Sequence, residues 1–139
     1  MNRSDLQQLA RTRLPEARVL FDHRRYEGAY YLLGYAVECA LKAYIAKQTR
    51  RYDFPPDRKF VNDIYTHDLN KLLGVSGLEP EYRKEVQRNP NFELNWMTVK
   101  DWSEHSRYIT GVSRARSKDF RSAVVSRKNG VLPWLQKYW

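Results

Sequence analysis

The sequence predicts an all-α protein, an up-and-down bundle of four to five main helices in a single domain that spans residues 1–139. Residues 26–47 contain no proline and many strong helix formers, so they favour one long helix. Apolar residues cover most of that helix, which is typical of the central helix of a bundle. The hydrophobic fraction of 42% is enough for one core in a chain of 139 residues.

One narrow polar line runs along the central helix, through Glu27, Tyr31, Gly34, Glu38 and Lys42. Glu38 precedes Lys42 by four residues, the favourable spacing for a helical ion pair. A charge near a bilayer centre costs about 2.5 to 3.5 kcal/mol, so this helix is not expected to cross a membrane. We expect Glu38 and Lys42 to be structural rather than catalytic, because a buried charge needs a partner.

The first helix is predicted over residues 5–22, where Ser4 and Gln7 have the spacing of a capping box. Pro15 lies inside it and predicts a kink or a split, because proline removes one backbone hydrogen bond. Residues 23–25 form a short turn, so the first helix and the central helix should be antiparallel neighbours.

Residues 48–63 predict a basic and aromatic loop, in which Pro55 and Pro56 exclude a helix. Arginines interleaved with aromatic residues suit nucleic acid, through phosphate contacts and base stacking. The alternative is a loop whose aromatic side chains pack onto the bundle. The candidate binding residues in this loop are Arg50, Arg51 and Arg58.

Five further helices and one turn complete the expected bundle. They are a third helix over 67–73 with Thr66 as N-cap and Gly74 as stop, a short helix from Pro80, a turn over 88–91, a helix over 93–109 closed by Gly111, a helix from Ser113 to residues 129–130 with Ala115 inside, and a terminal helix at Pro133.

Lys and Arg number 25 against 16 Asp and Glu, which gives a net charge of +9. A basic domain of this size indicates a polyanionic partner such as RNA, DNA, a nucleotide or an acidic protein, although solubility alone is the alternative. Cys39 is the single cysteine and is expected to be a buried apolar residue. The chain opens without a signal peptide, so we expect a cytoplasmic protein.

Metal and cofactor sites are not expected. His23, His67 and His105 fall in different predicted elements without ligand spacing, and the sequence contains no glycine-rich phosphate-binding motif. His67, beside Asp68, could contact a ligand phosphate at a helix N-terminus, or form a local hydrogen bond that orients the loop, which we favour.

Four segments in order carry a family resemblance. Residues 28–47, preceded by Arg25 and Tyr26, resemble the second helix of HEPN domains, and residues 65–73, 105–111 and 129–139 resemble further landmarks of one HEPN subgroup. These small helical domains occur in prokaryotic toxin–antitoxin, defence and nucleotide-handling systems. The resemblance implies a HEPN-like bundle and a homodimer.

Many HEPN proteins are metal-independent ribonucleases that use an arginine followed after four to six residues by a histidine. Histidine moves the proton and arginine holds the phosphate. Here the order is reversed at His105 and Arg107, and Lys100 has the motif spacing upstream of His105. The one literal match, Arg18 to His23, lies in the first helix. These four arginines and histidines are the catalytic candidates.

The resemblance leads to one preferred function and two alternatives. We expect an RNA- or nucleotide-binding protein that is the partner of a minimal nucleotidyltransferase in a toxin–antitoxin or defence pair. The alternatives are a HEPN endoribonuclease with an unusual Arg/His pair and a non-catalytic interaction module. Arg107 and His67 join the binding candidates, while Tyr108, which follows Arg107 at a subgroup landmark, is expected to pair or pack near Glu38 and Lys42.

Overall fold

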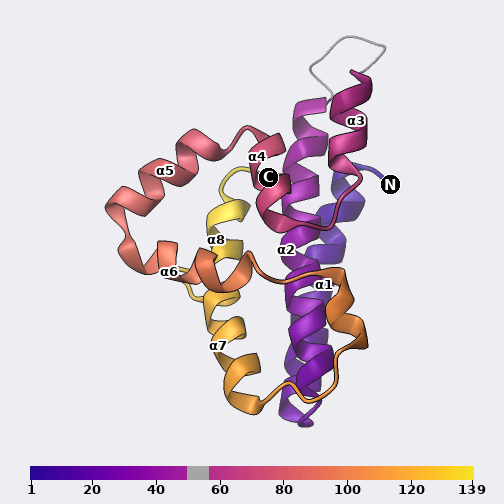
Figure 1. Ribbon diagram of the computed structural model, residues 1–139, viewed down its shortest axis with the longest axis vertical. Helices are drawn as coiled ribbons and strands as arrows, with labels where there is room; N and C mark the ends of the chain where they lie inside the picture. The colour runs from indigo at the N-terminus through magenta and orange to yellow at the C-terminus, as the bar shows by residue number, and fades with distance from the viewer. Residues whose placement is uncertain (50–56) are drawn as a thin grey trace.

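The computed structural model describes residues 1–49 and 57–139, which form helices and no strand. Two long antiparallel helices, α1 (Arg3–Asp22) and α2 (Tyr26–Thr49), run along most of the length of the molecule (Figure 1). The remaining elements are α3 (Arg58–Ile64), α4 (Leu69–Ser76), α5 (Glu79–Arg88), α6 (Pro90–Val99), the 3₁₀ helix η1 (Glu104–Tyr108), α7 (Arg114–Val125) and α8 (Val131–Gln136). The all-α prediction is confirmed, with more and shorter helices in the second half than expected.

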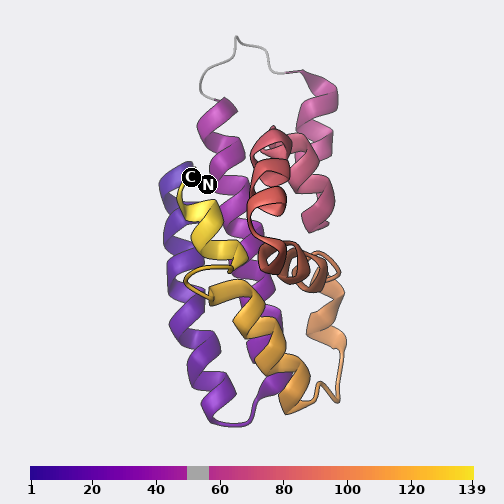
Figure 2. The same cartoon turned by 90° about the vertical axis from the view of Figure 1, so that its left-hand side faces the viewer.

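The central position of α2 follows from its composition. It packs against α1, α4, α7, α8 and η1, so almost every side of the helix meets another element (Figure 2). Leu33, Val37 and Leu41 are fully buried in the main core. That core also contains the rings of Trp96, Trp102 and Phe120. No helix in the described part of the chain has the length and apolar character needed to cross a bilayer.

The start of α1 corrects the predicted capping box. Asn2, not Ser4, is the N-cap: its side chain accepts the Asp5 N–H at 3.0 Å, and the Asp5 carboxylate accepts the Asn2 N–H at 2.9 Å. Pro15 lies inside α1 without splitting it. Ala10 and Ala17 are buried on either side of the proline, so packing on α2 holds the helix together across the lost hydrogen bond.

The predicted loop over residues 48–63 is wrong at both ends. The central helix continues to Thr49, and α3 begins at Arg58, where the Asp57 carboxylate accepts the Lys59 N–H at 3.0 Å. The cap at Asp57 is a helix-start signal that the two prolines before it obscured. Arg50 and Arg51 lie outside the described residues.

The third predicted helix is displaced along the chain. Asp68, not Thr66, caps α4, since its carboxylate accepts the Lys71 N–H at 2.9 Å, while Thr66 Oγ1 accepts the Asp68 N–H at 3.2 Å. The helix passes through Gly74 and ends at Gly77, which has a left-handed φ of 80°. A glycine fits that conformation without the clash that a Cβ would make.

The predicted helix over 93–109 is wrong beyond Val99. α6 begins earlier, at Pro90, and ends at Val99, after which the chain turns and η1 follows. Trp102, in the connection, is 2% exposed and packs on α2. The last two helices start where they were expected, although Ala115 is exposed rather than inside.

Candidate functional site

The polar line of α2 is covered by the segment that follows α6. Glu27 accepts the Gly111 N–H at 2.9 Å, and its own backbone N–H together with that of Gly111 lowers the pKa of its carboxyl. The Tyr31 ring stacks on Trp102 with centroids 6.0 Å apart. The indole also lies against the backbone at Gly34. This part of the polar line, Glu27, Tyr31 and Gly34, is therefore covered by residues 102–111 and is not an open face.

Farther along the same line lies the Glu38 cluster, which consists of Glu38, Lys42 and His67. The Glu38 side chain is 3% exposed, and its Oε1 accepts hydrogen bonds from Lys42 Nζ and His67 Nδ1, both at 2.8 Å. The side chains of Lys42 and His67 are 25% and 52% exposed. Glu38 Oε2 is buried and has no hydrogen-bond partner among the residues that the structure describes. His67 thus contacts α2 and not the start of its own helix, a pairing across 29 residues that local sequence cannot show.

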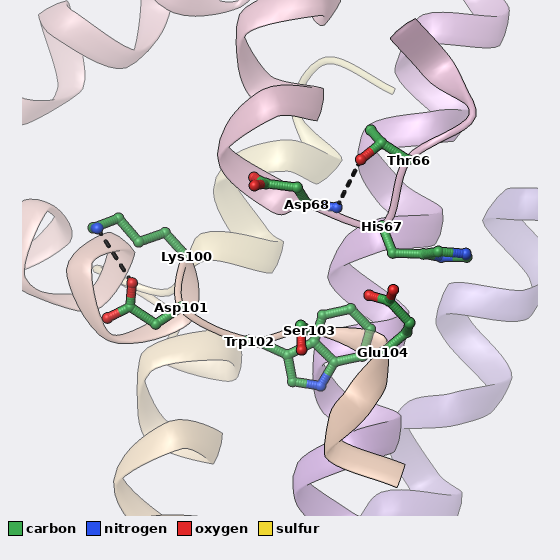
Figure 3. A pocket seen from close by; sticks show the side chains of 8 residues that line it. All are labelled: Thr66, His67, Asp68, Lys100, Asp101, Trp102, Ser103 and Glu104. Atoms are coloured by element: carbon green, nitrogen blue, oxygen red, sulfur yellow. Dashed lines mark hydrogen bonds and ion pairs between the residues drawn. The ribbon is translucent and has the colours of Figure 1, made fainter. Parts of the chain in front are cut away.

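A cavity of about 430 Å³ lies between residues 66–68 and residues 100–104. Figure 3 shows Lys100 and Asp101 on one side of it and His67 and Glu104 on the other. Lys100 Nζ pairs with Asp101 at 3.2 Å. Three carboxylates and one ammonium group, that of Lys100, line this cavity in the described part of the chain, so the cavity repels phosphate, and the phosphate interpretation of His67 loses support. The third carboxylate belongs to Asp68.

His105 and Arg107 lie two residues apart in η1, where each residue turns the helix by about 120° and the two side chains diverge. His105 is 78% exposed, with Nε2 3.7 Å from a Glu104 carboxylate oxygen. The Arg107 guanidinium lies over the Tyr108 ring at 4.9 Å, and a hydrogen bond to that phenol is the main cause that raises the pKa of Arg107. Neither Arg107 nor Tyr108 belongs to the Glu38 cluster.

The side chains of the literal motif match, Arg18 and His23, do not converge either. Five residues along a helix turn the side chain by about 140°, so the two project in different directions. His23 ends α1, and its Nδ1 lies 2.8 Å from the Val19 carbonyl oxygen. Arg18 Nε lies 3.9 Å from Asp22 instead.

Two basic segments converge at one end of the bundle. The turn between α1 and α2 lies beside the start of α7 in both views (Figures 1 and 2). The guanidinium groups of Arg114 and Arg121 lie 5.9 Å and 5.8 Å from the centroid of the Phe21 ring. We call this surface the basic end. It comprises Phe21, Arg24, Arg25, Tyr26, Arg114 and Arg121.

A hollow of about 670 Å³ opens at the basic end, lined by Phe21, Asp22, Arg24, Tyr26 and Arg114. The Phe21 and Tyr26 rings meet edge to face at 5.3 Å. Arg24 has a φ of 59°, which is uncommon for a residue with a Cβ. The hollow thus combines cationic side chains with aromatic surface.

Arg58, one of the predicted binding residues, does not form one surface with the basic end. Arg58 is the first residue of α3, which lies at the opposite end of the molecule (Figures 1 and 2). None of the six residues of the basic end was among the binding candidates that the sequence suggested. The available signal was Phe21, an aromatic residue followed closely by Arg24 and Arg25.

The described residues hold no group of three or more His, Cys, Asp or Glu side chains that could bind a metal ion. No curated protein matches the chain. No solved structure matches it either. The family model described as "HEPN domain" matches residues 4–129, which is most of the 139 residues. Together with the all-helical fold, this match shows that the chain belongs to the HEPN domain family.

Proposed function

We propose that this protein binds RNA or a nucleotide at the basic end. HEPN domains are helical domains related to nucleotides and RNA, which sets the class of ligand. The observation that carries the proposal is the placement of Arg114 and Arg121 around Phe21, next to Arg24 in the turn. Segments about 90 residues apart in the chain bring these groups together.

The chemistry of the basic end fits a single-stranded polyanion. Arginine holds phosphate oxygens through two parallel hydrogen bonds, and aromatic rings stack with bases of any sequence. Arg24 and Arg114 are exposed beside the half-buried rings of Phe21 and Tyr26, so both kinds of contact are available at one hollow. The net charge of +9 adds long-range attraction for the same ligand.

The biological role that we propose is that of a partner of a minimal nucleotidyltransferase in a toxin–antitoxin or defence pair. Family membership supports this role, since such pairs are a common setting of HEPN proteins. Co-expression with a nucleotidyltransferase encoded by a neighbouring gene tests it. A complex that survives size-exclusion chromatography supports the role, and separate elution contradicts it.

A salt titration tests RNA binding. Fluorescence anisotropy with a labelled single-stranded RNA should give an affinity that falls with salt, with a slope of about −0.7 per phosphate contacted. The double variant Arg114→Ala/Arg121→Ala should bind more weakly and show a flatter slope. The matched control is Arg83→Ala/Lys84→Ala, which removes two positive charges from exposed positions of α5, away from the basic end.

The control separates a local site from general attraction. If both double variants lose affinity equally, the net charge alone attracts RNA and the basic end is not a site. If neither loses affinity, or if the unmodified protein does not bind, the proposal is wrong. Melting curves by circular dichroism confirm that each variant is folded before it is compared.

A further inference from the structure

One carboxylate lies among the cations that line the hollow at the basic end. The Asp22 side chain is 59% exposed, and the ion pair that it makes with Arg18 Nε is long, at 3.9 Å. A carboxylate repels phosphate, so it weakens a surface that only neutralises a nucleic-acid backbone. Its place between Phe21 and Arg24 therefore needs a different explanation.

An ionised carboxylate offers only hydrogen-bond acceptors, on two neighbouring oxygens. In single-stranded RNA the Watson–Crick edges of the bases are open to protein groups. Guanine presents two adjacent donors there, N1–H and the N2 amino group. Adenine, cytosine and uracil each place an acceptor beside a donor on that edge, and the acceptor repels a carboxylate. A carboxylate in a base-binding hollow thus selects guanine.

The rest of the hollow supplies what a bound nucleotide needs besides its base edge. Phe21 and Tyr26 provide aromatic surface for stacking, with ring centroids 5.3 Å apart. Arg24 and Arg114 line the same hollow, and arginine is suited to hold phosphate through paired hydrogen bonds. A volume of about 670 Å³ leaves room for one nucleotide of a strand.

We propose that the hollow binds one guanine of a single-stranded RNA, with the Asp22 carboxylate accepting hydrogen bonds from N1–H and the N2 amino group. The base stacks on the aromatic pair, and Arg24 and Arg114 hold the flanking phosphates. This inference rests on the proposed function, because it names the base that the basic end prefers.

Short labelled RNAs test the preference by fluorescence anisotropy at constant salt. The sequence UUUGUUU should bind about tenfold more tightly than UUUAUUU or UUUUUUU, as a two-hydrogen-bond base contact provides. In Asp22→Asn the preference should fall below about twofold, while UUUUUUU binds at least as tightly as before, since a negative charge is removed. Glu79→Gln, an exposed carboxylate of α5, is the matched control and should keep the preference.

Other outcomes separate the two proposals. Arg114→Ala should weaken all three RNAs by a similar factor, because phosphate contacts carry no sequence information. GMP should displace the bound UUUGUUU more effectively than AMP, a measurement that needs no variant. If no RNA binds, both proposals fail. RNA binding without a guanine preference, or a preference that survives in Asp22→Asn, overturns this inference and leaves RNA binding in place.

Discussion

Trp102 lies against Gly34 so closely that an added Cβ at Gly34 would come within 2.2 Å of the indole ring. The indole is 2% exposed and stacks on Tyr31 one turn earlier in α2. This contact fixes the segment between α6 and η1 onto the central helix. It also explains why a glycine is found in the middle of a helix, where it costs roughly 1 kcal/mol relative to alanine.

We predict that Gly34→Ala destabilises the protein by about 3 kcal/mol or more, because the ring has no space to accept a methyl group. Urea denaturation measures the change. Gly28→Ala is the control, since its nearest neighbour is Leu20 Cδ1 at 3.0 Å, the end of a flexible side chain, and alanine favours the helix. If the two substitutions change the free energy of unfolding equally, Trp102 does not pack closely against Gly34.

The polar line of α2 shows which features the sequence can predict and which it cannot. Its periodicity predicted both the helix and the narrow polar stripe, because both depend on local spacing. What covers the stripe depends on residues 102–111, which the same reasoning assigned to a helix ending at residue 109. An apolar residue such as Trp102 suits the core face of its own helix. It suits equally a connecting segment that packs against another helix. Only the fold distinguishes the two.

The predicted end of α4 was wrong for a related reason. Gly74 and Gly77 are three residues apart and both satisfy the rule for a helix stop. The structure uses Gly77, where Ser76 Oγ donates to the Leu73 carbonyl at 2.6 Å and accepts the Leu78 N–H at 3.1 Å. Leu78 is 1% exposed, so the burial of a residue beyond the helix decides between two equal local signals.

The basic end was predictable only in part. The sequence shows where arginines are concentrated, but the number of surfaces they form depends on which helices are neighbours. α7 packs on α2 and brings Arg114 to Phe21, while α3 places Arg58 at the far end of the bundle.

The Glu38 cluster should respond differently to the loss of its carboxylate and to the loss of the two side chains that donate to it. Lys42→Met/His67→Gln leaves a buried carboxylate without its lysine partner and should cost about 3 to 5 kcal/mol. Glu38→Gln should cost only about 1 to 2 kcal/mol, because Lys42 and His67 are partly exposed and reach water. Urea denaturation at pH 7 compares the two.

Lys71→Met serves as the control for that comparison. Its pair with Asp63 is exposed and 3.6 Å long, so the expected cost is below about 1 kcal/mol. If Glu38→Gln costs as much as the double variant, the buried charge does not dominate the cluster.

Cys39 should make the stability depend on alkaline pH. Burial raises the pKa of its thiol from 9.0 to about 11, and burial also raises the pKa of Tyr35, to about 12. Between pH 9 and 11 the folded thiol keeps a proton that the unfolded chain loses. The free energy of unfolding therefore falls as pH rises through this window, and the contribution is complete below pH 9.

Denaturation curves between pH 8 and 11 check this expectation against Cys39→Ala, in which Tyr35 is retained. The variant should lose less stability per pH unit across the window. Parallel pH profiles for the two proteins would show that the thiol ionises as easily in the folded state as in the unfolded chain.

We predict a homodimer, as HEPN domains often form. Trp96, Trp102 and Trp134 are each 2% exposed in the core, so their rings do not supply an interface. Leu94 and Tyr108 are better candidates for an interface, at 65% and 72% exposed. Light scattering should give twice the 16.6 kDa of one chain, and a mass of 16.6 kDa at high concentration contradicts the prediction.

The protein should bind RNA without cleaving it. Bound RNA should remain intact in the presence of EDTA, because neither candidate Arg/His pair converges on one phosphate. His105 and Arg107 diverge around η1, and Arg107 is held over the Tyr108 ring. His23 is bound to the Val19 carbonyl oxygen on a side of α1 that differs from that of Arg18. A gel of labelled RNA after prolonged incubation measures the outcome.

Cleavage that disappears in His105→Ala would mean that a partner chain completes the site at η1. Cleavage that disappears in His23→Ala would mean that the end of α1 is catalytic. Cleavage that persists in both variants identifies a contaminating nuclease, provided that an Arg114→Ala/Arg121→Ala preparation cleaves equally.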